Sequence, residues 1–533
     1  MSKIIKRKTS EIQTDVMLEY GANQNIARAF PDYRDGLKPV ARRVLYTMFQ
    51  MKLGPKSKKS KVAAIVGNTM RLFHPHGDTS IGDNVVQMAQ YWKNNLPLVS
   101  GEGNFGSPYG DDAAANRYIE ARLSTYAHDC FFSEWEDGIV HMKEGLEDKK
   151  EPVYLPSKYP NLLINGSFGL GFGDQTNIPL YNFREVCLMA ISLIKNPKGK
   201  ITLYPDFPLG GILGGRSDYE KINKTGRGKC KLRANYKVDK DGNLIILNMP
   251  YGKTTDKFEN KLYKLVNNNT IHGIKDVKDL SNQDNIIKIK LIIKKNFDPH
   301  KVMGDLYSKT GLQDHSSIHL RVIGDGEDFT IGVREYLLDW IDFRIGTKSS
   351  IYSRKVSKLK HRKHINVGLI KILEHPKCDE TITNIRNLKN RKEIEEMFID
   401  DFGLTTIQAE GLSGLAIHRF SKDGVYKLKA LVKSIDKEIV VYEKYLKNPL
   451  KIRDIIIEEL EDGIKKYGTK RQTVVKEEFK EDFLSDTDHV LVITDNYIKK
   501  LRGDVEVIGS VAKGDNVQSI MNVSNKSNLY LFD

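Results

Sequence analysis

A tyrosine directly after an arginine is the pair of residues in this sequence best suited to nucleophilic chemistry. Tyr118 follows Arg117 in the segment AAANRYIEARL, and the small residues before the pair predict a helical context with Arg122 one turn further on. A phenol, with a pKa of about 10, needs a cationic neighbour before it can attack at neutral pH, and an arginine does not lose its charge. Most tyrosines are core or interface residues with a satisfied hydroxyl, so the pair alone does not establish a nucleophile.

Two histidines flank a proline in the loop HPHGD, where His74 and His76 are followed by Asp78. Only one plausible third metal ligand is within reach, whereas structural metal sites usually have four ligands. A phosphate fits better, because Arg71 is close in sequence and Asp78 or Thr79 can cap a helix whose first N–H groups favour an anion. The alternative is a polar turn whose groups are all satisfied.

Two glycine-rich segments could bring the backbone close to a ligand. GEGNFG at residues 101–106 matches the dinucleotide pattern GxGxxG, but SPYG follows it and prolongs the loop where a dinucleotide site needs a helix. We therefore reject that interpretation, and no GxxxxGK[ST] phosphate loop occurs. GSFGLGFG at residues 166–173 presents Phe168, Leu170 and Phe172 between its glycines. It is either a tight turn or an apolar wedge that unstacks bases.

The elements that must position these residues are mainly helices in the first part of the chain. Between about residues 25 and 127 we predict one helix that begins at Pro39, a second in VAAIVGNTMRLF and a third after the HPHG loop. A short glycine-containing connection makes the second and third a candidate helix-turn-helix. From about residue 151 to 327, the strand-like runs NLLING, GNLIILNMPY and NIIKIKLIIKKN predict a mixed α/β region.

Helical periodicity returns from about residue 330 in two separate apolar seams. Within each seam the residues recur in steps of three, four or seven, which is typical of a coiled coil, so we expect an antiparallel pair of helices joined by a short helical block. After about residue 486, HVLVITDN and NLYLFD predict strands. The seams consist of Ile345, Tyr352, Val356 and Leu359, and of Leu428, Val432, Ile435, Ile439, Tyr442 and Leu446.

Length and composition exclude several classes of protein. A chain of 533 residues predicts about three or four domains, and 40% hydrophobic residues exclude a mostly disordered chain. The net charge of +15 points to a polyanionic partner. Four scattered cysteines without a CxxC pair argue against a disulfide framework or a thiolate zinc site, and a reducing compartment fits best. The start lacks the apolar stretch of a signal peptide, and no apolar run could span a membrane, so we expect a soluble, cytoplasmic protein without a membrane partner.

Taken together, these segments resemble the breakage-reunion subunit of type IIA DNA topoisomerases, a family that includes the A subunits of DNA gyrase and topoisomerase IV and the medium subunit of phage enzymes. RAFPDYRDGLKPVARRVLY, HPHGDTSIGDNVVQMAQ, GEGNFGS, DDAAANRYIEARL and YPNLLINGSFGLGFGDQTNIP follow one another as in that family. The resemblance covers about residues 20 to 480. It implies DNA as the substrate and a bacterial cell or phage-infected host as the setting.

The resemblance also implies roles for individual residues. Tyr118 matches the nucleophile that becomes joined to the 5′ phosphate of DNA, and Arg117 matches the arginine that stabilises charge on that phosphate. Leu170 matches the isoleucine that wedges between base pairs, and Thr79 and Asp83 match the two positions where quinolone drugs make contact. Family positions that line the cut DNA are occupied by Arg28, Lys38, Arg42, Arg43, His74 and His76.

The implied fold is multidomain α+β. The predicted parts are an N-terminal arm (1–24), a winged-helix DNA-cleavage domain (25–150), a tower domain (151–327), a long antiparallel coiled coil (328–470) with a helical dimer gate at about 374–424, and a linker with a short β-rich tail (471–533).

The implied activity is ATP-dependent passage of one duplex through a staggered double-strand break in another. A homodimer would place Tyr118 on both strands, and a partner resembling the B subunit of gyrase would complete a heterotetramer. Mg²⁺ and ATP are both expected on that partner, with no metal bound by this chain. A Gln-Arg-Arg-Gly-Gly wrapping sequence is absent, so relaxation or decatenation is expected rather than supercoiling. The alternatives are a catalytically silent DNA-binding or architectural protein on the same scaffold, and a nicotinamide-dependent enzyme built on GEGNFG.

Overall fold

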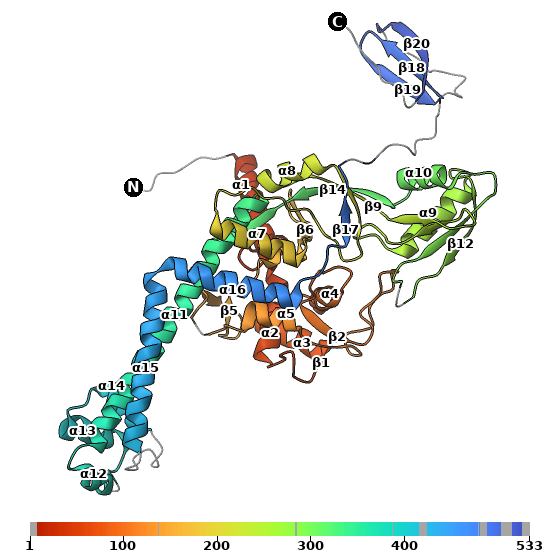
Figure 1. Ribbon diagram of the computed structural model, residues 1–533. Coiled ribbons are helices and arrows are strands. Elements are labelled where there is room, and N and C mark those ends of the chain that lie inside the picture. The colour runs from red at the N-terminus through yellow and green to blue at the C-terminus, as the bar shows by residue number, and fades with distance from the viewer. Residues whose placement is uncertain are drawn as a thin grey trace.

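The computed structural model combines helices and sheets in several parts, as the predicted multidomain α+β class requires (Figure 1). The predicted strand in NLYLFD, the start of the arm and part of the predicted gate lie outside the described residues. The structure describes residues 8–136, 138–282, 285–385, 387–414, 424–477, 479, 488–502 and 514–524.

The first part of the chain forms a helical head with a small sheet. Pro39 occupies the start of α2, where a missing N–H removes no helical hydrogen bond. The helix after HPHG begins at Asp78, but the predicted side-chain cap is wrong, because Gly77 takes the N-cap position and no side chain caps the helix. The elements are α1 (Thr9–Gln24), the π-helical turn η1 (Asn25–Ala29), α2 (Pro39–Gln50), α3 (Val62–Leu72), α4 (Asp78–Ala89), and the antiparallel strands β1 (Ser60–Lys61), β3 (Glu120–Leu123) and β2 (Val99–Glu102) in that order.

A short segment then leads from the head to the larger sheets. Its helical turns are α5 (Thr125–Ala127) and η2 (His128–Phe132), and its strands β4 (Met142–Glu144) and β5 (Lys150–Pro152) pair antiparallel. The apolar run NLLING was predicted as a strand, but it forms the helix α6 (Asn161–Asn165). A short apolar run buried on all sides has no periodicity that separates a helix from a strand, and Leu162, Leu163 and Ile164 are each fully buried.

A six-stranded sheet packs on the head. Its last strand comes from residues 473–475, which we predicted as part of a linker; three residues are too few to give a strand pattern in the sequence. This strand is parallel to its neighbour and the other pairs are antiparallel. The helices of this part of the chain are α7 (Phe183–Lys195) and α8 (Arg216–Thr225). The strand order is β17 (Thr473–Val475), β8 (Gly211–Gly214), β9 (Arg227–Arg233), β14 (Gln313–His319), β7 (Gln175–Ile178) and β6 (Ser167–Leu170).

One hydrophobic core unites the head with this sheet. It runs from Leu37 in the head to Leu232 in β9 and includes Trp340 and Leu460 from the later helices. The predicted boundary between residues 150 and 151 therefore does not separate two cores.

A four-stranded sheet forms a second α/β layer with its own core at one end of the molecule (Figure 1). Phe258, Leu262 and Leu306 from its two helices pack with strand residues such as Leu291. The order is β10 (Tyr236–Val238), β11 (Leu244–Ile246), β13 (Ile289–Ile293) and β12 (Ile274–Asp279), and the helices are α9 (Thr255–Asn267) and α10 (Pro299–Lys309). The antiparallel hairpin of β15 (Arg321–Gly324) and β16 (Glu327–Thr330) follows β14 of the six-stranded sheet.

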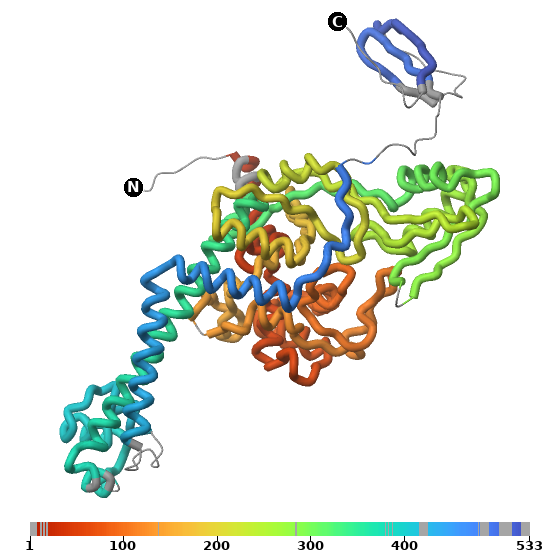
Figure 2. Tube along the Cα trace, viewed as in Figure 1, coloured from red at the N-terminus to blue at the C-terminus, as the bar shows by residue number. Residues whose placement is uncertain are grey.

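A long helical arm extends from the opposite end (Figure 2). The 41-residue α11 (Val333–Leu373) runs outward and α15 (Gly424–Lys447) returns beside it. Residues of the two predicted seams meet here: Val356 packs with Ile435 and Ile439 in a buried cluster, and the rings of Tyr352 and Tyr442 stack with their centroids 5.4 Å apart.

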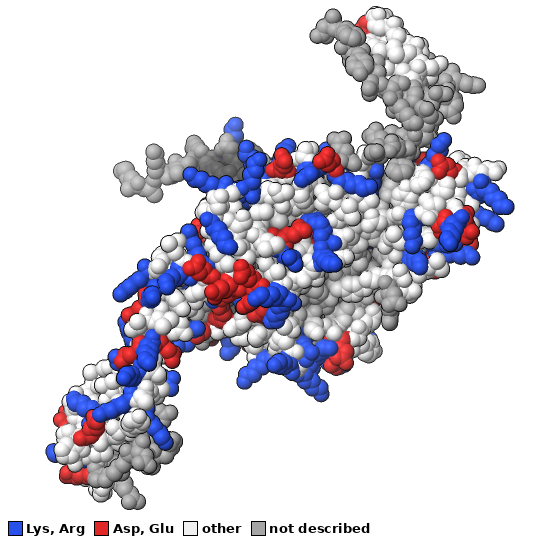
Figure 3. Space-filling model, viewed as in Figure 1, with Lys and Arg blue, Asp and Glu red and all other residues white. Residues whose placement is uncertain are grey.

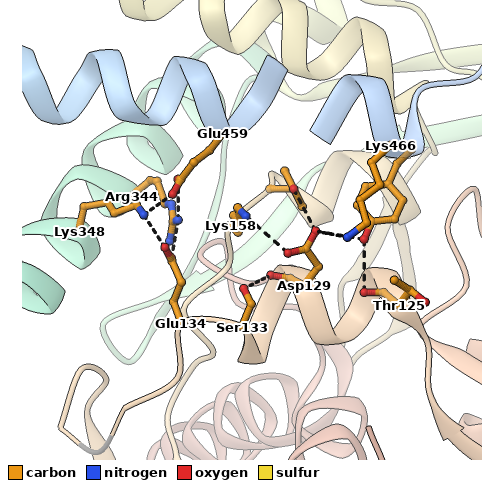
Figure 4. A network of polar contacts seen from close by, with 11 residues as sticks. Thr125, Asp129, Ser133, Glu134, Lys158, Arg344, Lys348, Glu459 and Lys466 are labelled. Atoms are coloured by element: carbon orange, nitrogen blue, oxygen red, sulfur yellow. Dashed lines mark hydrogen bonds and ion pairs between the residues drawn. The ribbon is translucent and has the colours of Figure 1, made fainter. Parts of the chain in front are cut away.

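Three short helices close the outer end of the arm, and another helix returns to the body. The outer helices are α12 (Cys378–Ile385), α13 (Arg391–Phe402) and α14 (Thr406–Ser413), and α16 (Pro449–Tyr467) lies back against α7. At the base of the arm, Arg344 and Lys348 of α11 bind Glu134 and Glu459 (Figure 4). Beyond the six-stranded sheet, β18 (Asp488–Thr494) pairs with β19 (Ile498–Arg502) and β20 (Val517–Ser524). Within the described ranges, no helix combines the length and apolar character that crossing a bilayer requires.

Candidate DNA-cleavage site

Tyr118 lies in a turn immediately before β3, with its side chain exposed. Sixty-five per cent of its surface is open to solvent, and its backbone N–H donates to the carbonyl of Ala115 over 2.8 Å. The helix that we predicted for this segment is wrong. The alanines lead into β3, which pairs with β1 and β2, and this pairing outweighs their helix propensity.

Arg117 provides the positive charge next to the phenol. Its guanidinium carbon lies 4.6 Å from the centre of the Tyr118 ring, within the range of a cation–π contact. Arg122, which we expected one helical turn away, lies instead in β3 and donates to the carbonyl of Ser57. Arg117 is therefore the arginine that this turn places against the tyrosine.

The Tyr118 turn rests on α4. Gly82 of α4 is buried, and a Cβ at this position would overlap the side chain of Asn116 in the turn. Thr79 and Asp83 are exposed on the same helix, on either side of Gly82 in sequence. The tyrosine turn and the first turns of α4 thus belong to one continuous part of the head.

A cavity of about 490 Å³ opens at the start of α4. The rings of His74 and His76 lie 4.6 Å apart in its wall, and the cavity also reaches Arg28. The free N–H groups of a helix N-terminus and nearby cationic side chains both favour an anion such as phosphate. The lining residues are Ala27, Arg28, Val40, His74, His76, Gly77, Thr79 and Ser80.

His74 is neutral and held in one orientation. Burial, and then the charge of Arg43, lowers the pKa of His74 to about 4. An N–H of Arg43 donates to Nδ1 of His74 over 2.8 Å, so the ring proton must be on Nε2. The neutral ring can therefore donate a hydrogen bond from Nε2, as a phosphate oxygen requires. Burial and the charge of Arg28 also lower the pKa of His76.

Arg43 contacts His74, which lines the cavity, from the side away from the cavity. Its Nε and Nη2 donate to the two carboxylate oxygens of Glu151 over 2.6 and 2.8 Å, and its third nitrogen binds His74. Through the bond to Nδ1, Arg43 orients His74. Nη1 and Nη2 of Arg43 each have a second N–H, so the expected contact of Arg43 with DNA stays a prediction.

Two further predicted DNA-lining residues are also engaged internally. Arg42 is buried, and its guanidinium donates to Asp35 over 2.7 and 3.0 Å and to the carbonyl of Leu37. This gives Arg42 a structural role, and its contact with DNA stays a prediction. Lys38 is half-buried, donates to the carbonyl of Phe168, and has a pKa lowered by burial. Arg28, by contrast, is exposed.

The glycine-rich segment forms a β-hairpin made of β6 and β7. Phe168, Leu170 and Phe172 are 61%, 71% and 53% exposed, so the apolar side chains project from the hairpin. Leu170 pairs with Gln175 directly before the turn. This is a suitable position for an apolar wedge.

Three residues that sequence reasoning missed hold these groups in place. Glu151 lies 108 residues from Arg43, Asp35 binds the backbone N–H of Leu155 as well as Arg42, and Asn25 lies 147 residues from the hairpin residue that it binds. No local pattern in the sequence signals contacts over such separations.

Charge is unevenly distributed on the head. Figure 3 shows positive side chains gathered below α2, α3 and β1, and the loop in this region carries Lys52, Lys56, Lys58 and Lys59. Among the described residues, no group of three or more His, Cys, Asp or Glu side chains is placed to hold a metal ion.

An exposed tyrosine with an arginine on its ring, on a basic head with a cavity suited to phosphate, defines a site able to receive a phosphodiester. A family model described as the A subunit of DNA gyrase/topoisomerase IV matches residues 28–461. The chain belongs to this family.

Similar curated proteins are named as the A subunit of DNA gyrase. The protein from Chlamydia muridarum is 32% identical over 559 residues, which cover 99% of this chain and 66% of the relative. The proteins from Chlamydia pneumoniae and Streptomyces coelicolor are 34% and 31% identical, and the matches cover 93% and 97% of this chain and 61% and 63% of those relatives. The chain thus spans slightly less than two thirds of the length of these relatives.

Proposed function

We propose that this chain is the DNA cleavage and religation subunit of an ATP-dependent type IIA DNA topoisomerase. The observation that carries the proposal is the exposed Tyr118 ring with the guanidinium of Arg117 4.6 Å from its centre. A catalytically silent DNA-binding protein would have no need of this pair. The nicotinamide alternative fails because GEGNFG leaves β2 and enters an irregular loop, whereas a dinucleotide site needs a helix there.

The reaction is a transesterification at phosphorus. The phenolic oxygen of Tyr118 attacks a DNA phosphodiester, a bond from this oxygen to phosphorus forms, and the bond from phosphorus to the 3′ oxygen breaks. The phenol loses its proton and the 3′ oxygen leaves as a hydroxyl. Because one phosphoester replaces another, the 3′ hydroxyl can reverse the reaction without an energy source.

Arg117 and His74 have different roles in this scheme. Arg117 stabilises the charge that develops on the scissile phosphate, and an arginine suits this role because it stays protonated. His74 donates its Nε2 hydrogen bond to a DNA phosphate in the cavity, together with Arg28 and His76. Leu170 enters the base stack and bends the cut duplex.

The domain assignments follow the same proposal. We assign residues 25–150 to a winged-helix cleavage domain, 151–327 to a tower and 328–470 to a coiled coil with a dimer gate at about 374–424. The antiparallel packing of α11 and α15 and the three short helices at the outer end support the last of these assignments. A homodimer then presents Tyr118 to both strands.

The partner and cofactors belong to the assembled enzyme. We propose a heterotetramer with a second protein that resembles the B subunit of gyrase and carries ATP and Mg²⁺. We expect this assembly to work in the cytoplasm. Mg²⁺ bound there would polarise the phosphate that Tyr118 attacks. Thr79 and Asp83, exposed on α4, are the positions that we propose for quinolone contact.

A covalent-adduct assay tests the nucleophile. The chain is mixed with its partner, supercoiled DNA, Mg²⁺ and ATP, quenched with detergent and examined for protein joined to 5′ DNA ends. Tyr118→Phe should abolish the adduct. Tyr109→Phe is the matched control, because Tyr109 is also exposed on the head, and it should leave the adduct intact. An undiminished adduct in Tyr118→Phe would reject the assignment, and no adduct in any variant would favour the silent DNA-binding protein.

A further inference from the structure

One buried asparagine holds the tip of the hairpin that carries Leu170. The Oδ1 of Asn25 accepts the backbone N–H of Phe172 over 2.6 Å, and its Nδ2 donates to the carbonyl of Phe172 over 3.2 Å. Both polar atoms of the side chain are therefore used on one hairpin residue. Asn25 is only 6% exposed, so water does not compete strongly for these bonds.

Glycines in the hairpin allow this close approach. A Cβ on Gly171 would overlap Oδ1 of Asn25, and a Cβ on Gly169 would overlap the carbonyl of Ala29 at the other end of η1. The whole of η1 thus lies against β6, with Asn25 at the tip and Ala29 one turn below. The hairpin has room for η1 because Gly169 in β6 and Gly171 in the turn lack side chains.

The aromatic ring of Phe172 extends the contact to α1. A Cβ on Gly21 would overlap this ring, so the helix and the ring are in direct contact. The hairpin is therefore contacted by Gly21 in α1 of the N-terminal arm and, four residues further on, by Asn25 of η1.

An ion pair holds the opposite side of the turn. Asp174 lies 3.2 Å from Nε of Arg321 and 3.5 Å from Nδ1 of His319. Arg321 is in turn paired with Asp328 at 2.6 Å. The turn is thus fixed from both sides, by the neutral amide of Asn25 in η1 and by an ionic network from β15 and β16.

We propose that Asn25 is a positioning residue for DNA bending, which holds Leu170 at the angle needed to enter the base stack and connects the N-terminal arm to that wedge. The inference rests on the proposed function. It assigns no contact with DNA to Asn25: the amide fixes the backbone of Phe172, and the backbone two residues earlier carries the wedge. A rotation of η1 or α1 would move Phe172 and therefore Leu170.

The competing explanation is that the turn is rigid by itself. The N–H of Gly171 donates to the carbonyl of Asp174 over 2.8 Å, and β6 and β7 are paired along their length. If these bonds suffice, removing the Asn25 amide will lower stability without changing DNA bending. The experiment must therefore measure bending separately from stability and from cleavage.

Fluorescence resonance energy transfer across a short duplex labelled at both ends measures the bend. All variants are made in a Tyr118→Phe chain assembled with its partner and Mg²⁺, so that no cleavage occurs. Asn25→Ala should reduce the ratio of bent to unbent complexes on the order of tenfold, since it removes two buried hydrogen bonds. Asn25→Asp keeps the acceptor for the Phe172 N–H and should show a smaller loss.

Two control variants separate a specific effect of Asn25 on bending from the loss of any buried asparagine and from the loss of the wedge itself. Asn223→Ala removes an equally buried asparagine, 7% exposed, that binds the carbonyl of Leu203 away from the hairpin, and it should leave bending unchanged. Leu170→Ala removes the wedge and should abolish the bend. A Tyr118→Phe chain that does not bend DNA at all would count against the proposed function itself. Normal bending in Asn25→Ala, with bending lost in Leu170→Ala, would overturn only the role of Asn25.

A double variant provides an independent check. Gly171→Ala alone should weaken bending, because its methyl group displaces the Asn25 side chain. In the Asn25→Ala background the overlap with the amide is gone and the carbonyl of Asp174, at 3.2 Å, is the remaining close neighbour, so Gly171→Ala should cause a smaller further loss. Fully additive losses would show that the two positions do not act through one contact and would overturn the proposal.

Discussion

Glu151 binds two nitrogens of Arg43, and this pairing aims the third nitrogen of Arg43 at Nδ1 of His74. The order of these three groups determines the tautomer of His74. Arg43 always donates, so Nδ1 must accept and the proton of the neutral ring stays on Nε2. A carboxylate that has no contact with the cavity thus determines which hydrogen bond His74 can offer there.

Glu151→Gln should impair both stability and DNA cleavage. The amide keeps the shape of Glu151 but removes the charge that faces Arg43, and breaking a largely buried pair costs about 3 kcal/mol. We expect a lower urea midpoint and a reduced adduct yield at temperatures where the variant is still folded. Glu147→Gln, which loses an exposed pair with Arg71, is the control and should change neither measurement appreciably. Wild-type behaviour of Glu151→Gln would contradict the relay.

His74 should make stability depend on acid. Its pKa is about 6.5 in an unfolded chain and about 4 in the folded protein, so between these values the unfolded chain binds more protons. The contribution is complete above about pH 6.5 and is lost as the pH falls through 4; its size is no more than about 3 kcal/mol. The difference in unfolding free energy between wild type and His74→Gln should therefore shrink as the pH falls from about 6.5 to about 4. A constant difference would contradict the assigned shift.

Arg42 should prove necessary for folding. Its partner Asp35 is fully buried and also accepts the backbone N–H groups of Leu37 and Leu155, so Arg42→Met leaves a buried carboxylate without its cation. We expect a loss of about 3 to 5 kcal/mol in denaturant unfolding. A stable Arg42→Met protein with weakened DNA binding would instead support the direct contact expected from the sequence.

The base of the helical arm depends on a buried ionic cluster (Figure 4). Arg344, which is fully buried, lies 2.6 Å from Glu134 and 2.8 Å from Glu459, and Lys348 binds the same two carboxylates. Although burial opposes it, the charges of Arg344 and Lys348 hold the pKa of Glu134 down at about 2. This stabilisation is complete above about pH 4.5 and is lost as the pH falls through 2.

Glu459→Gln should loosen α16 from α11 at the base of the arm. We expect a loss of about 3 kcal/mol, because two buried cations lose one of their two anions. Limited proteolysis should then cut faster near Asn448, between α15 and α16. The neighbouring Glu458 is exposed, so Glu458→Gln is the matched control and should resist proteolysis like wild type. Equal cleavage of both variants would show that the cluster does not secure the arm.

Local patterns predicted the helices better than the contacts between distant segments. Pro39 marked the start of α2, and the seams around Val356 and Ile435 found their partners because helical spacing is a local property. The run NLLING was misassigned because a short, fully buried segment has no polar face to set its period. The segment around Tyr118 forms a turn and not the predicted helix, because the strand pairing of β3 outweighed the helix propensity of the alanines.

In the candidate site, too, local patterns predicted individual residues better than the contacts between distant segments. Residue type and order predicted roles for Tyr118, Arg117 and His74, and these roles stay predictions. The sequence could not reveal that Arg43 faces inward to Glu151, because the two residues are 108 positions apart and meet only in the folded core. Asn25 gave no signal for the same reason. Showing that Arg43 orients a neighbouring side chain required the folded geometry.

Arg28 should contribute to DNA affinity through charge alone. It is exposed and lies in the wall of the cavity at the start of α4, so replacing it should remove one neutralised DNA phosphate without disturbing the core. In Arg28→Ala, the slope of the logarithm of affinity against the logarithm of salt concentration should become shallower by about one unit. Denaturant unfolding should stay within about 0.5 kcal/mol of wild type. Fluorescence anisotropy with labelled duplex at several salt concentrations measures the slope. An unchanged slope would place Arg28 outside the DNA path and would weaken the assignment of the cavity to phosphate.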